Sequence, residues 1–327
     1  MAFALDDHWV WDFWLADDGA LYHMFFLHAT HALGNPHLRH RNARIGHATS
    51  TDLKTWDYHG RVFEAGAPGA FDETATWTGS VVRGGDGLWR MFYTGSRFLT
   101  PDTHANVETI GVATSPDLYH WTKKPGPISV ADPRWYETLG SSSWPEEAWR
   151  DPWVFPSASG DLWHMLITAR AKDGDELDRG VIGHATSRDL EAWEVQPPLS
   201  ATGAGFAHLE VPQVISVAGR THLLFSCDAA KLAGSRSGAA GGIWSVATEA
   251  AEGPYPIASA QLIASEAIYS GRVAFDRDRK PVLLAFVNNA AGGRFVGTVS
   301  DPMPLVDRDG ALRIDEGAAE ALGLLMP

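Results

Sequence analysis

The chain of 327 residues contains a single cysteine, Cys227, and no hydrophobic run long enough to cross a membrane as a helix. One cysteine excludes an internal disulfide and is typical of a protein from a reducing compartment. Residues 1–7 contain neither the basic segment nor the apolar core of a secretory signal. We therefore expect a cytoplasmic protein.

Motifs for metal ions and phosphate groups are also missing. The 14 histidines lack the spacing of a zinc site, and neither a Walker loop nor a dinucleotide-binding fingerprint is present. The formal net charge is -14, with acidic and basic residues scattered rather than gathered in blocks, which disfavours nucleic acid and anionic membranes as partners. We expect no cofactor and no metal ion, and a small neutral molecule as the partner.

The sequence does contain a repeated unit. Five short runs of aromatic and branched residues each follow a turn-like segment, as buried strands of hairpins do. These runs are residues 21–26, 88–93, 162–167, 221–225 and 281–286. A second signature follows each run, at residues 45–50, 110–115, 182–187, 244–248 and 296–300. In the first three units an Asp-Leu pair and then a tryptophan come next, at Trp56, Trp121 and Trp193.

The repeat predicts the fold. A period of about 50 to 70 residues, with about four short strands per period and almost no helical periodicity, indicates a β-propeller. Five units fill the chain, and no linker separates them. We expect an all-β protein in which residues 1–327 form one catalytic domain. This domain is a five-bladed β-propeller of four-stranded antiparallel blades around an axial pocket, with no β-sandwich after it. The three tryptophans are expected to pack between blades.

Three acidic residues, Asp12, Asp151 and Glu210, lie at nearly the same place in three of the units. Acids at one register of a radial repeat can converge on its axis. Hydrolysis of a glycosidic bond needs two carboxyl groups, one to attack or shield the anomeric carbon and one to protonate the leaving oxygen. Any one acid alone is better explained by a turn cap or an ion pair, such as Arg150 beside Asp151. Three acids in one register favour a glycosidase.

The segments around these acids resemble motifs of glycoside hydrolase families 32 and 68, the clan of invertases, fructanases and levansucrases. The similar segments are Trp11-Asp12-Phe13-Trp14, Thr76-Trp77-Thr78-Gly79-Ser80, Arg150-Asp151-Pro152, His208-Leu209-Glu210-Val211-Pro212 and the stretch that begins at Tyr269. The resemblance covers nearly the whole chain. It implies that Asp12 is the nucleophile, Glu210 the general acid/base and Asp151 the stabiliser of the transition state.

The resemblance also implies a sugar pocket beside the acids. The expected substrate-binding residues are Trp11, Trp14, Trp77, Thr78, Ser80, Arg150 and Tyr269. Membership of a retaining clan would place the carboxyl groups of Asp12 and Glu210 about 5 to 5.5 Å apart. Segments 29–42, 98–107, 136–147 and 172–179 interrupt the blades and are expected to wall the pocket, which favours short substrates.

Three functions stay open at this point. The first is a retaining, exo-acting β-fructofuranosidase on sucrose or short fructo-oligosaccharides, with or without fructosyl transfer. The second is a propeller glycosidase for arabinofuranosides, which would use the same acids in a pocket of another shape. The third is a non-catalytic carbohydrate-binding propeller, which would tolerate the loss of any one acid. Departures from the family pattern at Leu27, Val211 and Gln213 bear on the sugar, because these positions shape the pocket.

Overall fold

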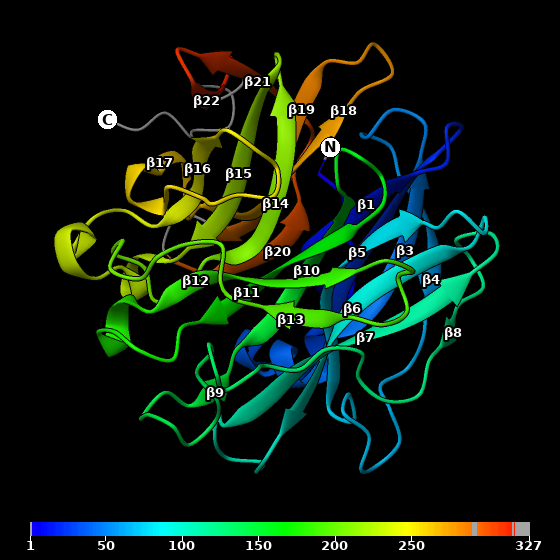
Figure 1. The fold of residues 1–327 in the computed structure, drawn as a ribbon. Coiled ribbons are helices and arrows are strands. Elements are labelled where there is room, and N and C mark those ends of the chain that lie inside the picture. The colour runs from blue at the N-terminus through cyan, green and yellow to red at the C-terminus, as the bar shows by residue number, and fades with distance from the viewer. Residues whose placement is uncertain (1, 290–292, 316, 318–327) are drawn as a thin grey trace.

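The computed structural model describes residues 2–289, 293–315 and 317. It confirms the predicted all-β fold and the five-bladed β-propeller (Figure 1). Blade one contains β1 (His8–Asp17), β2 (Tyr22–Thr30), β3 (Arg44–Ser50) and β4 (Asp57–Arg61). Blade two contains β5 (Ala75–Arg83), β6 (Trp89–Phe98), β7 (Asn106–Ser115) and β8 (Thr122–Lys123), and β9 (Glu146–Glu147) joins it parallel to β7.

The remaining three blades repeat this antiparallel order. Blade three contains β10 (Trp149–Pro156), β11 (Trp163–Arg170), β12 (Gly180–Ser187) and β13 (Glu194–Gln196). Blade four contains β14 (Glu210–Val217), β15 (Arg220–Cys227), β16 (Gly242–Thr248) and β17 (Gln261–Ser265). Blade five contains β18 (Ile268–Phe275), β19 (Pro281–Asn289), β20 (Phe295–Val299), β21 (Met303–Arg308) and β22 (Ala311–Ile314).

Each predicted run and signature coincides with a strand. The aromatic runs form the second strand of each blade, and the second signatures form β3, β7, β12, β16 and β20. The helices in the described ranges are short 3-10 turns: η1 (His31–Leu33), η2 (Pro36–Asn42), η3 (Glu176–Asp178), η4 (Ala229–Lys231), η5 (Gly234–Arg236) and η6 (Ile257–Ser259). None of these helices has the length and apolarity that a membrane span requires.

The outer tryptophans pack between blades, as predicted. The Trp121 ring of blade two meets Phe25 of blade one edge-on at a centroid distance of 5.5 Å, and Trp193 of blade three meets Phe92 of blade two at 5.4 Å. Trp56 packs in the cluster shared by blades one and five. Large aromatic surfaces at each blade junction stabilise the stacking of neighbouring sheets.

Blade five closes the ring against blade one. Phe3 exchanges two backbone hydrogen bonds with Val299 of β20, at 2.8 and 2.9 Å, and β1 contacts β18, β19 and β20. In Figure 1 the blue strand β1 accordingly lies beside the orange strands of blade five. The sequence predicts that blade five runs to Pro327; β22 is its last described strand, and residues 318–327 lie outside the described part.

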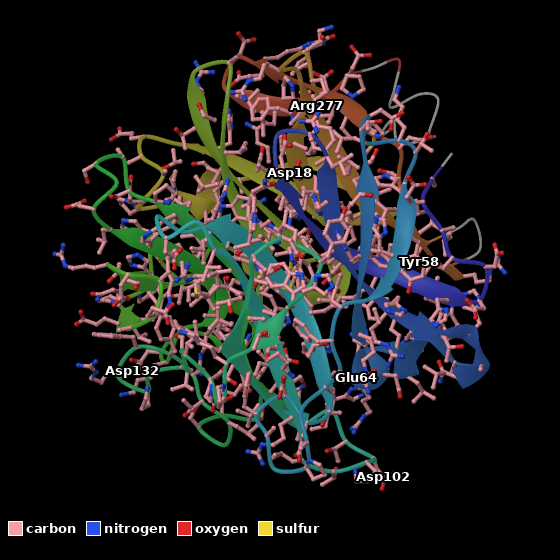
Figure 2. All side chains as sticks on the ribbon, turned by 90° about the vertical axis from the view of Figure 1, so that its right-hand side faces the viewer. Asp18, Tyr58, Glu64, Asp102, Asp132 and Arg277 are labelled. Atoms are coloured by element: carbon pink, nitrogen blue, oxygen red, sulfur yellow. The ribbon has the colours of Figure 1, made fainter. Side chains whose placement is uncertain are left out.

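The two ends of the propeller carry different connections: short turns at one end and long segments at the other. In Figure 2, Asp18 and Arg277, on the turns after β1 and β18, lie at one end, whereas Asp102 lies at the opposite end. The other labelled residues, Tyr58, Glu64 and Asp132, also lie toward the periphery. The long segments between the second and third strands, which include η1 and η2, belong to the end that carries Asp102.

Candidate active site

A β-bulge interrupts every innermost strand at the same place. The register with the second strand shifts between Trp11 and Phe13, Trp77 and Gly79, Arg150 and Trp153, Glu210 and Gln213, and Tyr269 and Arg272. The residues before the shift form one set, which we call the pre-bulge ring: Trp11, Trp77, Arg150, Glu210 and Tyr269. The first residues within the shift form the bulge ring: Asp12, Thr78, Asp151, Val211 and Ser270.

The rings correct the expected register of the three acids. Asp12 and Asp151 both lie in the bulge ring, but Glu210 lies one residue earlier, in the pre-bulge ring. Glu210 pairs with Ser226 as Arg150 pairs with Thr168. The reason is that the bulge in β14 begins after Glu210, which the motif alone does not reveal.

Three bulge residues have left-handed backbone angles. The φ values are 56° for Asp151, 53° for Val211 and 49° for Ser270. Left-handed residues other than glycine are uncommon and strained, and they gather at functional sites, where bulges re-aim side chains. The bulges bring groups of neighbouring blades within hydrogen-bonding distance.

Asp12 receives hydroxyl donors from both adjacent blades. Thr78 Oγ1 of blade two donates to Asp12 Oδ2 at 2.7 Å, and Ser270 Oγ of blade five donates to Oδ1 at 2.7 Å. Desolvation by the surrounding residues raises the pKa of Asp12, and these two hydrogen bonds oppose the rise. The Glu210 carboxylate adds to the rise, and Arg39 opposes it. The two hydrogen bonds thus fix the position of the Asp12 carboxylate, and the neighbouring groups determine its pKa.

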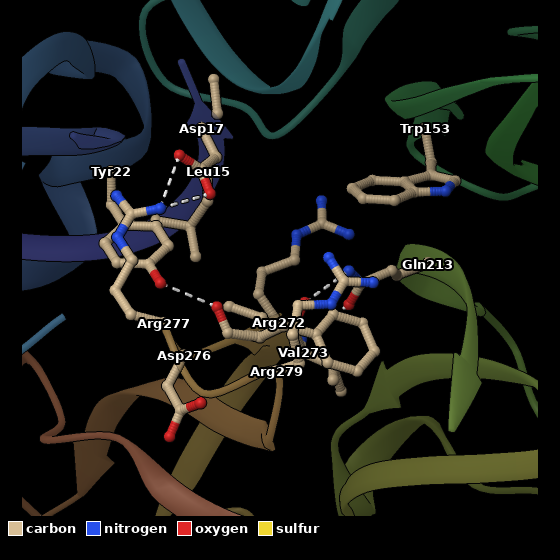
Figure 3. A pocket seen from close by; sticks show the side chains of 13 residues that line it. Leu15, Asp17, Tyr22, Trp153, Gln213, Arg272, Val273, Asp276, Arg277 and Arg279 are labelled. Carbon is tan, nitrogen blue, oxygen red and sulfur yellow. Dashed lines mark hydrogen bonds and ion pairs between the residues drawn. The ribbon is translucent and has the colours of Figure 1, made fainter. Parts of the chain in front are cut away.

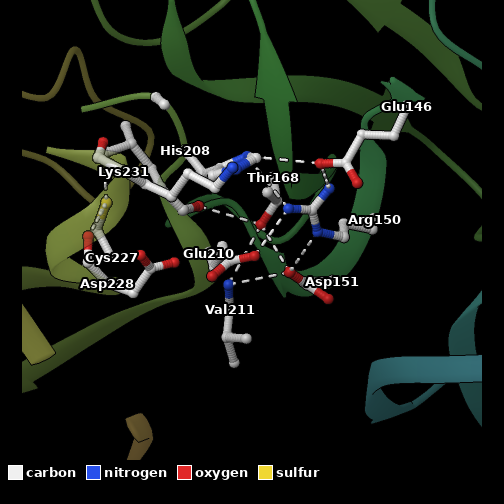
Figure 4. A network of polar contacts seen from close by, with 12 residues as sticks. Glu146, Arg150, Asp151, Thr168, His208, Glu210, Val211, Cys227, Asp228 and Lys231 are labelled. Carbon is white, nitrogen blue, oxygen red and sulfur yellow. Dashed lines mark hydrogen bonds and ion pairs between the residues drawn. The ribbon is translucent and has the colours of Figure 1, made fainter. Parts of the chain in front are cut away.

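Arg150 lies among four carboxylates, of which Glu146, Asp151 and Glu210 are labelled in Figure 4. Its Nη2 donates to Glu210 Oε1 at 2.8 Å, and its Nη1 donates to Glu108 Oε2 at 2.9 Å and to Glu146 Oε1 at 3.4 Å. Its Nε lies 3.7 Å from Asp151 Oδ2. These carboxylates raise the pKa of Arg150 well above its ordinary value, although burial alone would lower it. Arg150 is therefore a permanent cation at the centre of an acidic cluster.

Both carboxylate oxygens of Glu210 have donors. Arg150 occupies Oε1, and the Tyr269 hydroxyl donates to Oε2 at 2.7 Å. All three residues belong to the pre-bulge ring, from blades three, four and five. The Glu210 side chain is 23% exposed, so it is oriented by two partners and still open to a ligand.

Asp151 is buried, and donors hold its Oδ2 oxygen. Thr168 Oγ1 and the Val211 amide donate to its Oδ2 at 2.8 and 3.1 Å, and its own amide donates to Thr94 Oγ1 at 2.9 Å. Burial raises the pKa of Asp151 to about 7, while Arg150 opposes the rise. Asp12 and Glu210 contribute to it, which ties the three acids together electrostatically.

Of the predicted substrate-binding residues, five lie in the two rings and two do not. Trp11, Trp77, Thr78, Arg150 and Tyr269 are ring members. Trp14 has no exposed surface and stacks on Phe25, because it follows the bulge and points into the blade core. Ser80 is also buried, and its Oγ accepts from the Val154 amide of the next blade. The expectation that these two contact sugar is therefore corrected.

Several members of the site were not predicted as functional residues. Arg39, Thr94, Glu108, Glu146 and Thr168 lie outside the quoted motifs, whereas His208 and Ser270 lie within them beside Glu210 and Tyr269. An alignment of the five repeats could have found Ser270, because it is the bulge-ring residue of blade five, as Asp12 is of blade one. Within the described ranges, no group of three or more His, Cys, Asp or Glu residues is placed to hold a metal ion.

The predicted wall segments contact one another and the ring tryptophans. Trp77 Nε1 donates to the His40 carbonyl of η2 at 2.8 Å. Arg41 binds the Thr103 carbonyl and covers the Phe98 ring at 4.0 Å, which joins segments 29–42 and 98–107. Ser143 Oγ donates to Glu176 at 2.5 Å, joining segments 136–147 and 172–179.

The sequence has relatives among curated β-fructofuranosidases and invertases. It is 30% identical over 174 residues to an insoluble β-fructofuranosidase isoenzyme of Arabidopsis thaliana, covering 53% of this chain and 28% of that protein. It is 25% identical to a raffinose invertase of Escherichia coli, covering 91% of this chain and 61% of that protein. The chain thus matches less than two thirds of the length of either relative.

The fold has close counterparts among solved structures. An inulosucrase from Halalkalicoccus jeotgali, bound to kestose, superposes with a TM-score of 0.80 at 23% identity, covering 95% of this chain and 87% of that one. The sequence profile of the glycosyl hydrolases family 32 N-terminal domain matches residues 15–294, a range that begins just after Asp12. Because that range spans most of the propeller, the chain belongs to glycosyl hydrolase family 32.

Proposed function

We propose that this protein is a retaining glycoside hydrolase, an exo-acting β-fructofuranosidase that acts on sucrose or short fructo-oligosaccharides. One observation carries the proposal: carboxyl groups from blades one, three and four meet in two adjacent rings, each held by donors from neighbouring blades. Two fixed carboxyl groups that share an electrostatic environment are what glycoside hydrolysis requires.

In this proposal Asp12 attacks the anomeric carbon of the fructosyl unit. The hydroxyls of Thr78 and Ser270 bind one oxygen each, which favours the ionised form and limits rotation of the carboxylate. A covalent fructosyl ester on Asp12 then forms as the bond to the leaving group breaks. The family 32 match begins at residue 15, so it does not include Asp12. The main support for Asp12 as the nucleophile is therefore its two hydrogen bonds from neighbouring blades.

Glu210 acts as the general acid and then as the general base. It protonates the leaving oxygen in the first step and removes a proton from water, or from a sugar acceptor, in the second. Arg150 and Tyr269 fix its position through both steps. The proton moves only between Glu210 and the substrate or water.

Asp151 stabilises the oxocarbenium-like transition state without reacting. A preorganised carboxylate beside the developing positive charge lowers the barrier because it needs no reorganisation during the reaction. Its two donors, Thr168 and the Val211 amide, keep it in place. The contact of the 29–42 wall segment with Trp77 of the pre-bulge ring supports a preference for a terminal sugar and short chains.

Release of fructose from sucrose and short fructo-oligosaccharides tests the proposal, with nitrophenyl arabinofuranosides and other nitrophenyl glycosides as competing substrates. Asp12→Asn and Glu210→Gln should each lower turnover by several orders of magnitude with unchanged thermal unfolding. Asp52→Asn is the matched control, because Asp52 accepts backbone hydrogen bonds in the outer turn of blade one, away from the rings.

Three results would contradict the proposal. Faster hydrolysis of arabinofuranosides than of sucrose would show that sucrose is not the preferred substrate. Near-normal turnover in either acid variant would reject the role of that residue. Sugar binding without turnover in the parent protein would identify a binding propeller.

A further inference from the structure

A second pocket lies at the opposite end of the propeller from the wall segments (Figure 3). It has a volume of about 310 Å³ and is lined by inner-strand residues that follow the bulges, together with the turn after β18. Trp153, Gln213 and Arg272 come from three different blades, and Arg277 and Arg279 come from the turn. This volume is in the range of small-molecule sites.

Arg272 is buried in this pocket with part of its guanidinium unpaired. It is 1% exposed. Nη1 donates to the Pro212 carbonyl at 2.8 Å and Nε to the Phe13 carbonyl at 3.3 Å, but Nη2 has no acceptor in the described ranges. No carboxylate of the described part lies within ion-pair distance of it. A buried cation with a free donor is costly unless a ligand binds it.

Two further groups donate towards the pocket, the buried indole N–H of Trp153 and the guanidinium of Arg279, an exposed residue. Trp153 Nε1 is buried without an acceptor in the described part of the chain, and the Arg272 guanidinium lies 5.2 Å from the centre of the Trp153 ring. Arg279 contacts the Phe275 ring at 5.4 Å and forms no ion pair with any described residue. In Figure 3, Arg272, Arg279 and Trp153 all border the same space.

The acids of the pocket do not neutralise these donors. Asp17 binds Arg277 through both oxygens, at 3.0 and 2.8 Å. Asp276 accepts the Lys280 amide at 2.8 Å within its own turn. The lining therefore holds three arginines, Arg272, Arg277 and Arg279, against the two aspartates Asp17 and Asp276, and this excess of positive charge favours an anion over a cation or a neutral sugar.

We propose that this pocket binds a small organic anion, whose carboxylate or phosphate group accepts hydrogen bonds from Arg272, Arg279 and Trp153. Apolar side chains favour a ligand with an apolar body, because Leu15, Val273 and the rings of Tyr22 and Phe275 line the same pocket. A planar or aliphatic body packs there while the charged group reaches the guanidinium groups. The pocket adjoins the bulge ring, because Arg272 Nη1 also donates to the Val211 carbonyl at 3.3 Å and Asp12 and Asp151 act electrostatically on Arg272. The binding of an anion there does not depend on the proposed hydrolase activity.

Titration calorimetry with benzoate, phenyl phosphate and inorganic phosphate tests the site, with benzyl alcohol as the uncharged probe. We expect one binding site per chain for benzoate or phenyl phosphate, and the tighter of the two identifies the preferred charged group. Arg279→Ala should weaken that binding by about tenfold or more, as loss of a charge-assisted hydrogen bond does. Trp153→Phe, which keeps a ring but removes the N–H, should weaken it severalfold.

The controls distinguish this pocket from the rings and from a general attraction of anions to surface arginines. Arg188→Ala removes an exposed arginine from the turn after β12 and should leave binding unchanged. Sucrose should not compete for binding, because the proposed sugar site lies on the other side of the rings. The proposal is overturned if neither aromatic anion binds, if benzyl alcohol binds as tightly as benzoate, or if Arg279→Ala and Trp153→Phe bind like the parent protein.

Discussion

The two hydroxyls on Asp12 offer a sharp test of its role. Ser270→Ala and Thr78→Val each remove one donor and keep the size of the side chain nearly constant. Thr78 and Ser270 are both buried, at 1% exposed, and they bind opposite oxygens of the carboxylate at 2.7 Å. Each substitution should therefore act on the ionised form of Asp12.

The magnitude follows from the strength of such contacts. A hydrogen bond to a charged group contributes about 1.5 to 3 kcal/mol, and about 1.4 kcal/mol corresponds to one pH unit of pKa. Loss of either hydroxyl should thus raise the pKa of Asp12, already raised by burial, by about one to two pH units. The acid needs a higher pH to ionise, so the variant loses activity first at low pH.

The assay is the pH profile of kcat/KM on sucrose, since this ratio reports ionisation in the free enzyme. The acidic limb should move to higher pH in each variant and further in the double variant, while activity above the limb falls less. An unmoved limb, with activity reduced equally at every pH, would refute the assignment of Asp12 as the ionising nucleophile.

Two other predictions concern the acids around Arg150. Burial raises the pKa of Glu108 from 4.5 to about 8. Between these values the folded protein keeps a proton that the unfolded chain has lost, so the free energy of unfolding should fall as pH rises. In Glu108→Gln, the free energy of unfolding, measured with urea, should decrease less between pH 5 and pH 8 than it does in the parent protein. An equal decrease in both proteins would contradict the raised pKa of Glu108. Asp151→Asn should lower kcat by about 10²- to 10³-fold with a smaller change in KM, and steady-state kinetics in which KM changes more than kcat would reject its role in the transition state.

The fold could be predicted because each blade repeats the same local signals. The Ser-x-Asp-Leu turn illustrates this: the Ser50 hydroxyl accepts the Leu53 amide, and Leu53 takes a left-handed φ of 64°. Ser115 and Leu118 repeat that contact in blade two, as do Ser187 and Leu190 in blade three. Local chemistry repeated at a fixed period makes the architecture readable before any tertiary contact is known.

The site was only partly predictable, because its details depend on register and on loops. A bulge adds a residue to one strand and turns the following side chain to another face. Trp14 therefore points into the blade core, and Glu210 lies in the pre-bulge ring instead of the bulge ring. Arg150 was recognised, but its partners Glu108 and Glu146 come from β7 and β9. The packing of blade two against blade three brings Glu108 to Arg150, whereas Glu146 lies only four residues before Arg150 in the chain and becomes a partner through the strand that it forms beside β7.

The most direct test of the proposed mechanism is the stereochemistry of fructosyl transfer to methanol, followed by NMR before the enzyme hydrolyses the methyl fructofuranoside that forms. Attack by Asp12 and then by the acceptor inverts the anomeric carbon twice, so sucrose should yield methyl β-fructofuranoside, and Asp12→Asn should yield essentially none. Methyl α-fructofuranoside as the first product would contradict the account, because single inversion requires Asp12 to act as a base on the acceptor rather than as the nucleophile.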